Sequence, residues 1–171
     1  MTLESDLVRR IVGLERRLAE IEARERAASI VAIYYSNATQ TIPNSTATII
    51  NFNMMEVDTH SAVTTGTSWK FMAPVGGYYH IDAKILFAGT TTWADGEVGE
   101  FNLYVNGTAK ANLNRKDNYG SSSSLLMGLG GGTIVYLNSG DYVHAAVIQT
   151  SGGSLTIYSN GFYNRIAIIK I

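Results

Sequence analysis

Apolar residues in the first part of the chain recur with the seven-residue period of a coiled coil. They occupy positions a and d of the heptad for two full repeats. The residues of this seam are Leu7, Ile11, Leu14, Leu18 and Ile21. A helix of this length, with Gly13 inside it, would be only marginally stable alone in water. The pattern therefore predicts a helical stalk over residues 1–28 that several chains build together.

Charged residues beside this seam favour parallel chains. Arg10 and Arg17 fall on position g, and Glu15 and Glu22 fall on position e. In a parallel coiled coil a g residue meets the e residue five positions further on in the neighbouring chain. Both Arg10–Glu15 and Arg17–Glu22 resemble the short trimerisation pattern Arg-apolar-x-x-apolar-Glu, which implies three chains. The shapes of the seam residues alone leave dimers, trimers and tetramers open. An amphipathic helix packed on its own head is the alternative to a coiled coil.

From residue 30 onward the apolar positions recur every second residue, as in β-strands. Residues 77–87 alternate in this way, which predicts a half-buried strand of about eleven residues. Asn106 and Gly107 follow another alternating run and suit the positive φ angles of a type I′ hairpin turn. Further strands are expected at 30–35, 46–53, 124–137, 141–150 and 162–171. About eight to ten short strands separated by turns predict an antiparallel sandwich or barrel.

Composition divides the chain at the same place. Residues 1–28 contain six arginines and six acidic residues, and all 17 aromatic residues follow residue 28. A charged segment without aromatic residues, followed by one rich in Gly, Tyr and Thr, is typical of a helix followed by a β domain. We therefore expect a stalk over residues 1–28 and one globular head over residues 29–171.

Charge and hydropathy exclude several classes of partner. The net charge is −1 at pH 7, so the basic surface that nucleic acid would require is not expected. No run of 18 apolar residues suggests a membrane span, and the first residues do not have the pattern of a secretory signal. We therefore expect a protein that is made and assembled in a cytoplasm, without nucleic acid or membrane insertion.

Residues that could carry catalysis or hold a cofactor are scattered. His60, His80 and His144 lie on separate segments without ligand spacing, and the chain has no cysteine. The glycine run 128–132 is not followed by the Lys-Ser/Thr pair of a phosphate-binding loop. His80 and His144 fall on strand faces opposite the expected core, which predicts solvated side chains. We expect no enzyme activity, no metal site and no cofactor.

Two loops have the composition of binding surfaces. Residues 114–124 are rich in Tyr, Ser, Gly and Asn, and Trp93 lies in polar surroundings, where aromatic hot spots are often found. Because consecutive antiparallel strands alternate in direction, counting back from the last strand places these loops together at the end of the head far from the stalk. The candidate binding residues are Trp93, Arg115, Lys116 and Tyr119. The alternatives are ordinary exposed connections with Trp93 folded back onto its head, or loops facing the stalk if 155–159 is a full-length strand.

The head resembles the C1q/tumour-necrosis-factor-like jelly roll over most of residues 30–171. Phe71, Gly77 and Tyr79 match the family pattern Phe-x5-Gly-x-Tyr-x-Phe, although Ile81 replaces the last Phe. Further landmarks follow in the expected order: Phe52 with Asp58 before this stretch, then Leu103–Gly107, Leu137–Val143 and Phe162–Ile168 after it. The resemblance implies an antiparallel jelly-roll sandwich that assembles as a trimer with threefold symmetry and binds proteins or glycans without catalysis.

Three functions are consistent with these observations. The first is a phage virion component, such as a capsid decoration protein, a head fibre or a small fibre knob, bound to capsid or other virion proteins and able to contact host-surface glycan or protein. The second is a bacterial or spore surface adhesin, which would require an export route. The third is a carbohydrate-active jelly roll, which would require a pair of carboxylates facing a cleft. We favour the virion component.

Overall fold

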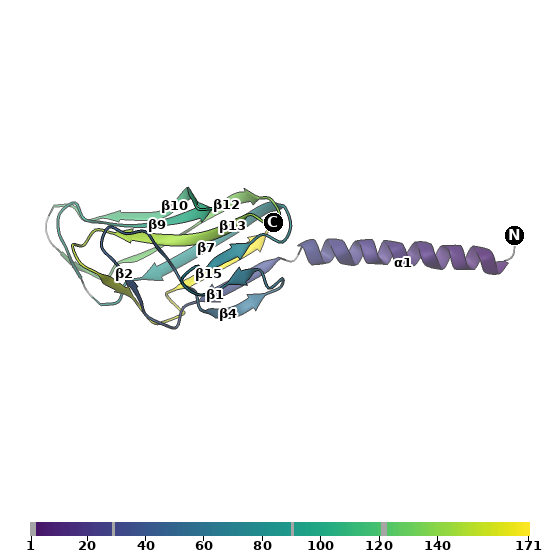
Figure 1. Cartoon of the computed structure of the whole chain (residues 1–171), viewed down its shortest axis with the longest axis horizontal. Coiled ribbons are helices and arrows are strands. Elements are labelled where there is room, and N and C mark those ends of the chain that lie inside the picture. Colours follow the sequence, from purple (N-terminus) through teal and green to yellow (C-terminus); the bar gives the residue numbers. More distant parts are fainter. Residues whose placement is uncertain (1–2, 29, 90, 121–122) are drawn as a thin grey trace.

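The computed structural model describes residues 3–28, 30–89, 91–120 and 123–171, which form one long helix and one β head (Figure 1). Helix α1 (Leu3–Ala28) points away from the head along its long axis. Every side chain from residue 7 to residue 24 is exposed. The helix therefore does not pack on its own head, contrary to that alternative.

Two antiparallel sheets make up most of the head. The first has the order β12 (Gly128–Leu137), β7 (Gly77–Leu86), β15 (Arg165–Lys170), β1 (Val31–Tyr35) and β4 (Met54–Asp58). The second has the order β10 (Thr108–Asp117), β9 (Val98–Val105), β13 (Tyr142–Gln149), β6 (Lys70–Met72) and β5 (Val63–Thr64), with β3 (Thr48–Ile49) also paired to β13. Two small ribbons pair β8 (Thr91–Trp93) with β11 (Ser123–Leu125), and β2 (Gln40–Ile42) with β14 (Leu155–Ile157).

The core lies between the two sheets and is built from the inward positions of each strand. The predicted strand at 77–87 is confirmed as β7, in which Tyr79, Ile81, Ala83 and Ile85 are buried while the residues between them face outward. Trp69 packs edge-on against the Phe52 ring at 5.4 Å, and its indole N–H donates to the Phe52 carbonyl oxygen at 3.1 Å. Burial of such large side chains supplies most of the stability of the head.

The predicted hairpin is also confirmed. Asn106 and Gly107 have φ angles of 50° and 79° and connect β9 to β10. Asn106 suits this turn for a second reason, because its side-chain amide donates to Asp141 and its side-chain oxygen accepts from the Tyr142 backbone N–H.

The strand expected at 46–53 is mostly absent. Only Thr48–Ile49 pairs as a strand, and the next strand begins at Met54. The side chain of Gln40 replaces the missing partner, because its amide donates to the Ile49 carbonyl at 2.7 Å and its oxygen accepts from Asn51 N–H at 3.0 Å. Ile50 and Phe52 can therefore both be buried while the backbone leaves the sheet.

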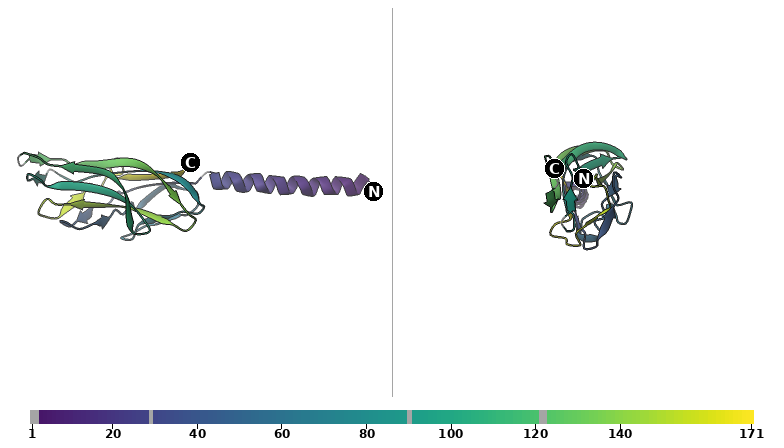
Figure 2. Two further views of the ribbon diagram at one scale, coloured as in Figure 1. Left: turned by 90° about the horizontal axis from the view of Figure 1, so that it is seen from above. Right: turned by 90° about the vertical axis from the view of Figure 1, so that its left-hand side faces the viewer.

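The glycine run at 128–132 marks a close approach of the two sheets. Strand β12 passes directly beside β10, and a β-carbon at Gly131 would collide with the Leu113 carbonyl oxygen. Only glycine lets the two backbones approach so closely. The sheets are therefore closed along this side, and in the end-on view of Figure 2 they curve around one interior.

Candidate functional site

The direction of the strands decides which loops lie far from the stalk. Tyr79, near the start of β7, pairs with Lys170, whose backbone N–H donates to the carbonyl of Ile30 where the chain enters the head. The start of β7 therefore lies at the stalk end and Leu86 at the far end, with β2 (Figure 1). Segments 94–97, 118–120 and 151–154 also lie at the far end of the head. Counting strands back from the end of the chain predicts this arrangement, because β14 has only three residues and does not act as an additional full-length strand.

Trp93 does not contribute to a binding surface at this end. Its side chain is fully buried and packs edge-on against Phe87 with 6.1 Å between ring centroids. The placement of Trp93 in an exposed patch was therefore wrong. Its neighbour Thr92 is exposed, but Trp93 is turned into the core.

Arg115, Lys116 and Tyr119 are exposed, and Lys116 lies on the opposite side of β10 from Arg115. The Arg115 guanidinium binds Asp117 at 2.8 Å and Glu100 at 3.4 Å on the outer face of the second sheet. The hydrogen bonds that the Arg115 guanidinium donates to Asp117 raise the pKa of Arg115 above its usual value. Lys116 is turned the other way and lines a recess beside Lys84. Tyr119 is 79% exposed in the following loop.

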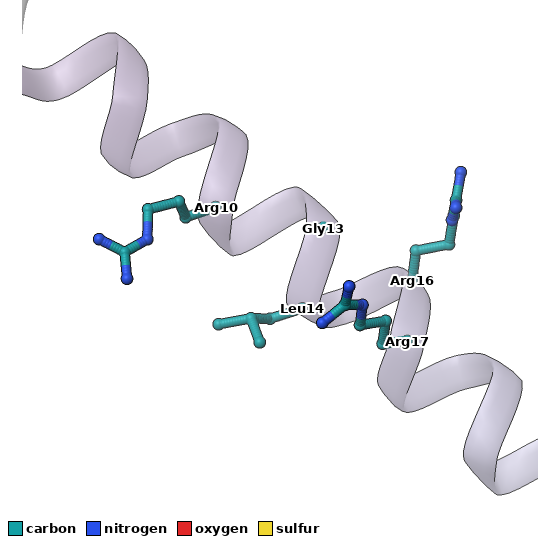
Figure 3. Close-up of a pocket in the computed structure, with 5 residues that line it drawn as sticks. All are labelled: Arg10, Gly13, Leu14, Arg16 and Arg17. Carbon is teal, nitrogen blue, oxygen red and sulfur yellow. The ribbon is translucent and has the colours of Figure 1, made fainter.

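The coiled-coil seam predicted on the stalk is the first large unpartnered surface. Leu7, Ile11, Leu14, Leu18 and Ile21 are each between 46% and 64% exposed. Beside Leu14 lies an open hollow of about 530 Å³, where Arg10 projects to the same side as Leu14 while Arg16 projects away (Figure 3). Its lining consists of Leu14, Gly13 and three arginine side chains, so it offers one apolar side chain and several positive charges to a neighbouring helix.

Charged residues on the side of the stalk away from the seam differ from those beside the seam. Arg16 and Glu20 form an ion pair at 3.5 Å, and both lie on the side away from the seam. Within residues 7–24 of the described helix, the seam-flanking residues have no ion-pair partner in their own chain: Arg10, Glu15, Arg17, Glu22 and Arg24. These charges are therefore free for a second chain.

The second unpartnered surface lies on the outer side of the five-stranded sheet, next to the stalk. It consists of exposed apolar side chains from three adjacent strands, and we call it the apolar face: Tyr78, Ile134, Tyr136, Ile169 and Ile171. The rings of Tyr78 and Tyr136 meet edge-on at 5.2 Å. Exposed apolar patches of this kind mark interaction surfaces.

The apolar face was missed at the level of sequence, although one signal was present. Residues 166–169 are all apolar, whereas a strand with one solvated face alternates apolar and polar residues. Ile166 and Ile168 are buried in the core, and Ala167 and Ile169 face outward. A strand that is apolar on both faces is typical of strands that are covered on both sides.

The described histidines and carboxylates do not gather into a metal-binding group. No group of three or more His, Asp or Glu side chains that could hold a metal occurs in the described parts of the chain. Nor does any described helix have the length and apolarity to cross a membrane. His80 is exposed as expected, but His144 is buried because its ring stacks on Tyr104 at 5.0 Å. This burial lowers the pKa of His144.

The strand order, the closed edge and the position of both sheets define the head as a C1q/TNF-like jelly roll. The Eiger TNF structure from S. frugiperda is similar with a TM-score of 0.60 and 13% identity, over 84% of this chain and 93% of that one. Murine APRIL is similar with a TM-score of 0.57 and 10% identity, over 84% and 99%. The globular domain of zebrafish complement 1qA is similar with a TM-score of 0.53 and 15% identity, over 83% and 97%.

At the level of sequence, no family model matches the chain. One curated relative, the uncharacterized protein YqcC of Bacillus subtilis, is 32% identical over 131 residues. The match covers 72% of this chain and 35% of YqcC, so the chain spans about a third of the length of that relative.

Proposed function

We propose that the protein is a non-enzymatic homotrimer in which three parallel helices form a coiled-coil stalk and three jelly-roll heads pack together at its end. The observation that carries this proposal is the pair of unpartnered apolar surfaces. The stalk enters the head at Ile30, beside the end of the apolar face that holds Tyr78 and Ile171, so association of three chains along the seam would also bring the three apolar faces together. The fold of the head supports the same assembly.

Charge complementarity in the stalk supports a parallel arrangement. Arg10 of one chain would meet Glu15 of the next, and Arg17 would meet Glu22, because g and e residues five positions apart face each other between parallel helices. Three copies repeat each pair around the axis. The 26 residues of α1 would then hold the heads roughly 39 Å from the start of the stalk.

We further propose that this trimer is a virion structural or attachment protein, such as a capsid decoration protein, a head fibre or a small fibre knob. A stiff stalk carrying loops at its far end suits display on a particle. Three equivalent heads also suit avidity for a repetitive surface, on a capsid or on a host cell. In this proposal the trimer is assembled in the cytoplasm of the host and has no cofactor.

The mass of the protein in solution tests the assembly. Light scattering on the full chain at micromolar concentration should give about 55 kDa, three times the 18.5 kDa of one chain. A monomer would contradict the proposal, and a dimer would contradict its symmetry.

Identification of the particle that carries the protein tests the proposed virion role. Antibody against the head should label phage particles in electron micrographs, and the protein should sediment with those particles through a density gradient. Label on cell or spore envelopes, with none on particles, would favour the adhesin instead.

A further inference from the structure

We propose that protonation of His80, beside Asp82, strengthens the packing of the three heads, a proposal that rests on the trimer above and adds its regulation. Both side chains are exposed on the outer side of β7, which lies between β12 and β15 in the five-stranded sheet (Figure 1). In the proposed trimer this side of the sheet faces a neighbouring head. The charges of the two residues therefore enter the contact between heads.

His80 lies inside the apolar face rather than at its border. Its pairing partner on β12 is Ile134, and its pairing partner on β15 is Ile169. Tyr78 precedes it on the same side of β7. When a neighbouring head covers the two isoleucines, the imidazole between them is covered as well. An imidazole changes its charge between about pH 5 and 8, so the contact contains a group that responds to pH in that range.

A glycine leaves His80 and Asp82 a common space. Gly132 of β12 pairs with Asp82, and a β-carbon at Gly132 would lie 3.1 Å from Asp82 Oδ2 and 3.2 Å from His80 Nε2. Because no side chain stands between the two polar groups, the imidazole N–H can turn to donate to the carboxylate when water is withdrawn. On β15 the residue opposite Asp82 is Ala167, which provides no competing polar group.

Other charged groups on this side of the sheet already have partners in their own chain. The Lys84 ammonium, next along β7, lies over the Phe162 ring at 5.0 Å. Arg165 of β15 is paired with Glu56 at 2.7 Å. Among the described residues, Asp82 has no ion pair. The remaining titratable side chains of the apolar face are two phenols, Tyr78 and Tyr136.

A neighbouring head offers one competing kind of cation. Its β10 strand runs beside β12 at the edge of the head and carries Lys110 and Lys116. An ammonium group from either lysine would neutralise Asp82 at neutral as well as at mildly acidic pH, and the contact would then not depend on pH in this range. We assign His80 as the cation because it already lies beside the carboxylate.

The direction of the effect follows from the hydration of Asp82. Separated heads leave its carboxylate in water, where a neighbouring cation adds little. Packed heads withdraw that water, and a carboxylate in a dry contact is unfavourable unless a donor or a cation compensates it. Protonated His80 supplies both. Packed heads therefore bind the proton more tightly than separated heads, so packing is strongest at mildly acidic pH and weakens as the pH rises and the imidazole loses its proton.

Thermal melting of the full-length trimer, followed by tryptophan fluorescence at about pH 6 and about pH 8.5, tests the proposal. His80→Gln keeps a polar side chain that takes up no proton, and all other titratable groups are common to parent and variant. If packed heads bind the proton tenfold more tightly, the melting temperature of the parent relative to His80→Gln should be roughly 2–4 °C higher at the lower pH. An equal response of parent and variant to pH would overturn the proposal.

Matched variants separate this pair from a general effect of pH. Asp82→Asn should abolish the same dependence and should melt above the parent at about pH 8.5, because it removes the carboxylate that has no partner there. His60→Gln removes an imidazole outside the apolar face and should keep the dependence of the parent. A lower melting temperature of Asp82→Asn at the higher pH would mean that a lysine of the neighbouring head pairs with Asp82, which would overturn the assignment of His80.

Two further measurements separate this proposal from the trimer on which it rests. Light scattering that gives a monomer contradicts both, whereas a trimer whose melting does not depend on His80 contradicts only this proposal. Ile134→Asp with Ile169→Asp should separate the heads, and in that background His80→Gln should no longer alter the pH dependence. An effect of the same size in that background would place the action of His80 within a single head and would overturn the proposal.

Discussion

At the scale of single residues, Gly131 controls how closely the two sheets approach. The position has an ordinary negative φ, so the requirement for glycine is spatial: its α-carbon passes against the backbone of Leu113, which cannot move without disturbing β10. Side chains at Leu113 and Leu129 complete the core on either side.

Gly131→Ala should therefore lower the free energy of unfolding by about 1–3 kcal/mol, the usual cost of adding a methyl group where no space exists. Urea denaturation followed by tryptophan fluorescence measures this change. Gly153→Ala is the matched control, because its added β-carbon would have open space around it and should change stability by less than about 0.5 kcal/mol. Equal stabilities of the two variants would show that the sheets can separate at no cost.

Asp58 and Tyr34 form a hydrogen-bonded pair. The carboxylate of Asp58 accepts from the backbone N–H groups of His60, Ala62 and Val63, and from the Tyr34 hydroxyl at 3.0 Å. Burial raises the pKa of Tyr34 from 10.0 to about 12, and the hydrogen bond to Asp58 and its negative charge act in the same direction.

The raised pKa predicts a loss of stability in alkali. Because the folded protein favours the protonated phenol, the contribution of Tyr34 is complete below pH 10 and is lost as the pH rises from 10.0 to about 12. Tyr34→Phe should lack this part of the fall in melting temperature between those pH values. Parallel melting curves of the parent and the variant, at every pH in that range, would contradict the raised pKa.

At the scale of elements, the charged residues beside the seam of the stalk are spaced so that they cannot form ion pairs with each other within one helix. Residues five positions apart do not face each other on one helix, since neighbours on a helix surface are three or four positions apart. Arg17 and Glu22 can therefore pair only between chains. The single ion pair within the described helix, between Arg16 and Glu20, has the i, i+4 spacing that one chain can satisfy.

A charge exchange tests this arrangement. Arg17→Glu alone should lower the melting temperature of the helical signal, because three like-charged contacts replace three ion pairs, each worth roughly 0.5 kcal/mol. Adding Glu22→Arg to the same chain should restore it. Arg16→Glu is the control on the opposite side and should have a smaller effect. If the double variant is no more stable than the single one, the helices are not parallel in the proposed register.

The elements that sequence alone could predict are those with a local cause. Helix α1, strand β7 and the Asn106-Gly107 turn follow from periodicity and from turn geometry within a few residues of each other. The loss of strand pairing at 51–53 could not be predicted, because it depends on the side chain of Gln40 on another segment. Trp93 was misplaced for a similar reason: its polar neighbours describe the surface of β8, whereas its own environment depends on Phe87.

At the scale of the whole molecule, the apolar face and the seam are two parts of one proposed interface. The seam was recognisable from its heptad spacing, whereas the apolar face was not, because on a β-strand a core position and a contact between subunits have the same composition. The structure separates them, since core residues such as Ile168 are fully buried while Ile169 beside it is 38% exposed.

Mutations should be able to disrupt the contact between the heads without disrupting the contact between the stalks. Ile134→Asp together with Ile169→Asp places charges in the apolar face, which should separate the heads by desolvation cost while the stalk keeps three chains together. Small-angle scattering should then show a larger radius of gyration at unchanged mass. The exposed Val75, which lies outside the defined face, provides the control as Val75→Asp. An unchanged radius of gyration would mean that the heads do not meet through this face.

Strand β1 gives the head a mechanical property. It is the first strand after the stalk, and it is hydrogen-bonded on one side to β15 and on the other to β4. A load that pulls the stalk away from a head held at its far end acts along β1, so the perpendicular bonds of both ladders are strained together in shear. Tension applied in single-molecule pulling through residues 30 and 152 should therefore require a higher rupture force than tension through residues 106 and 140, both at the stalk end. An attachment protein anchored in this way would hold its particle against flow.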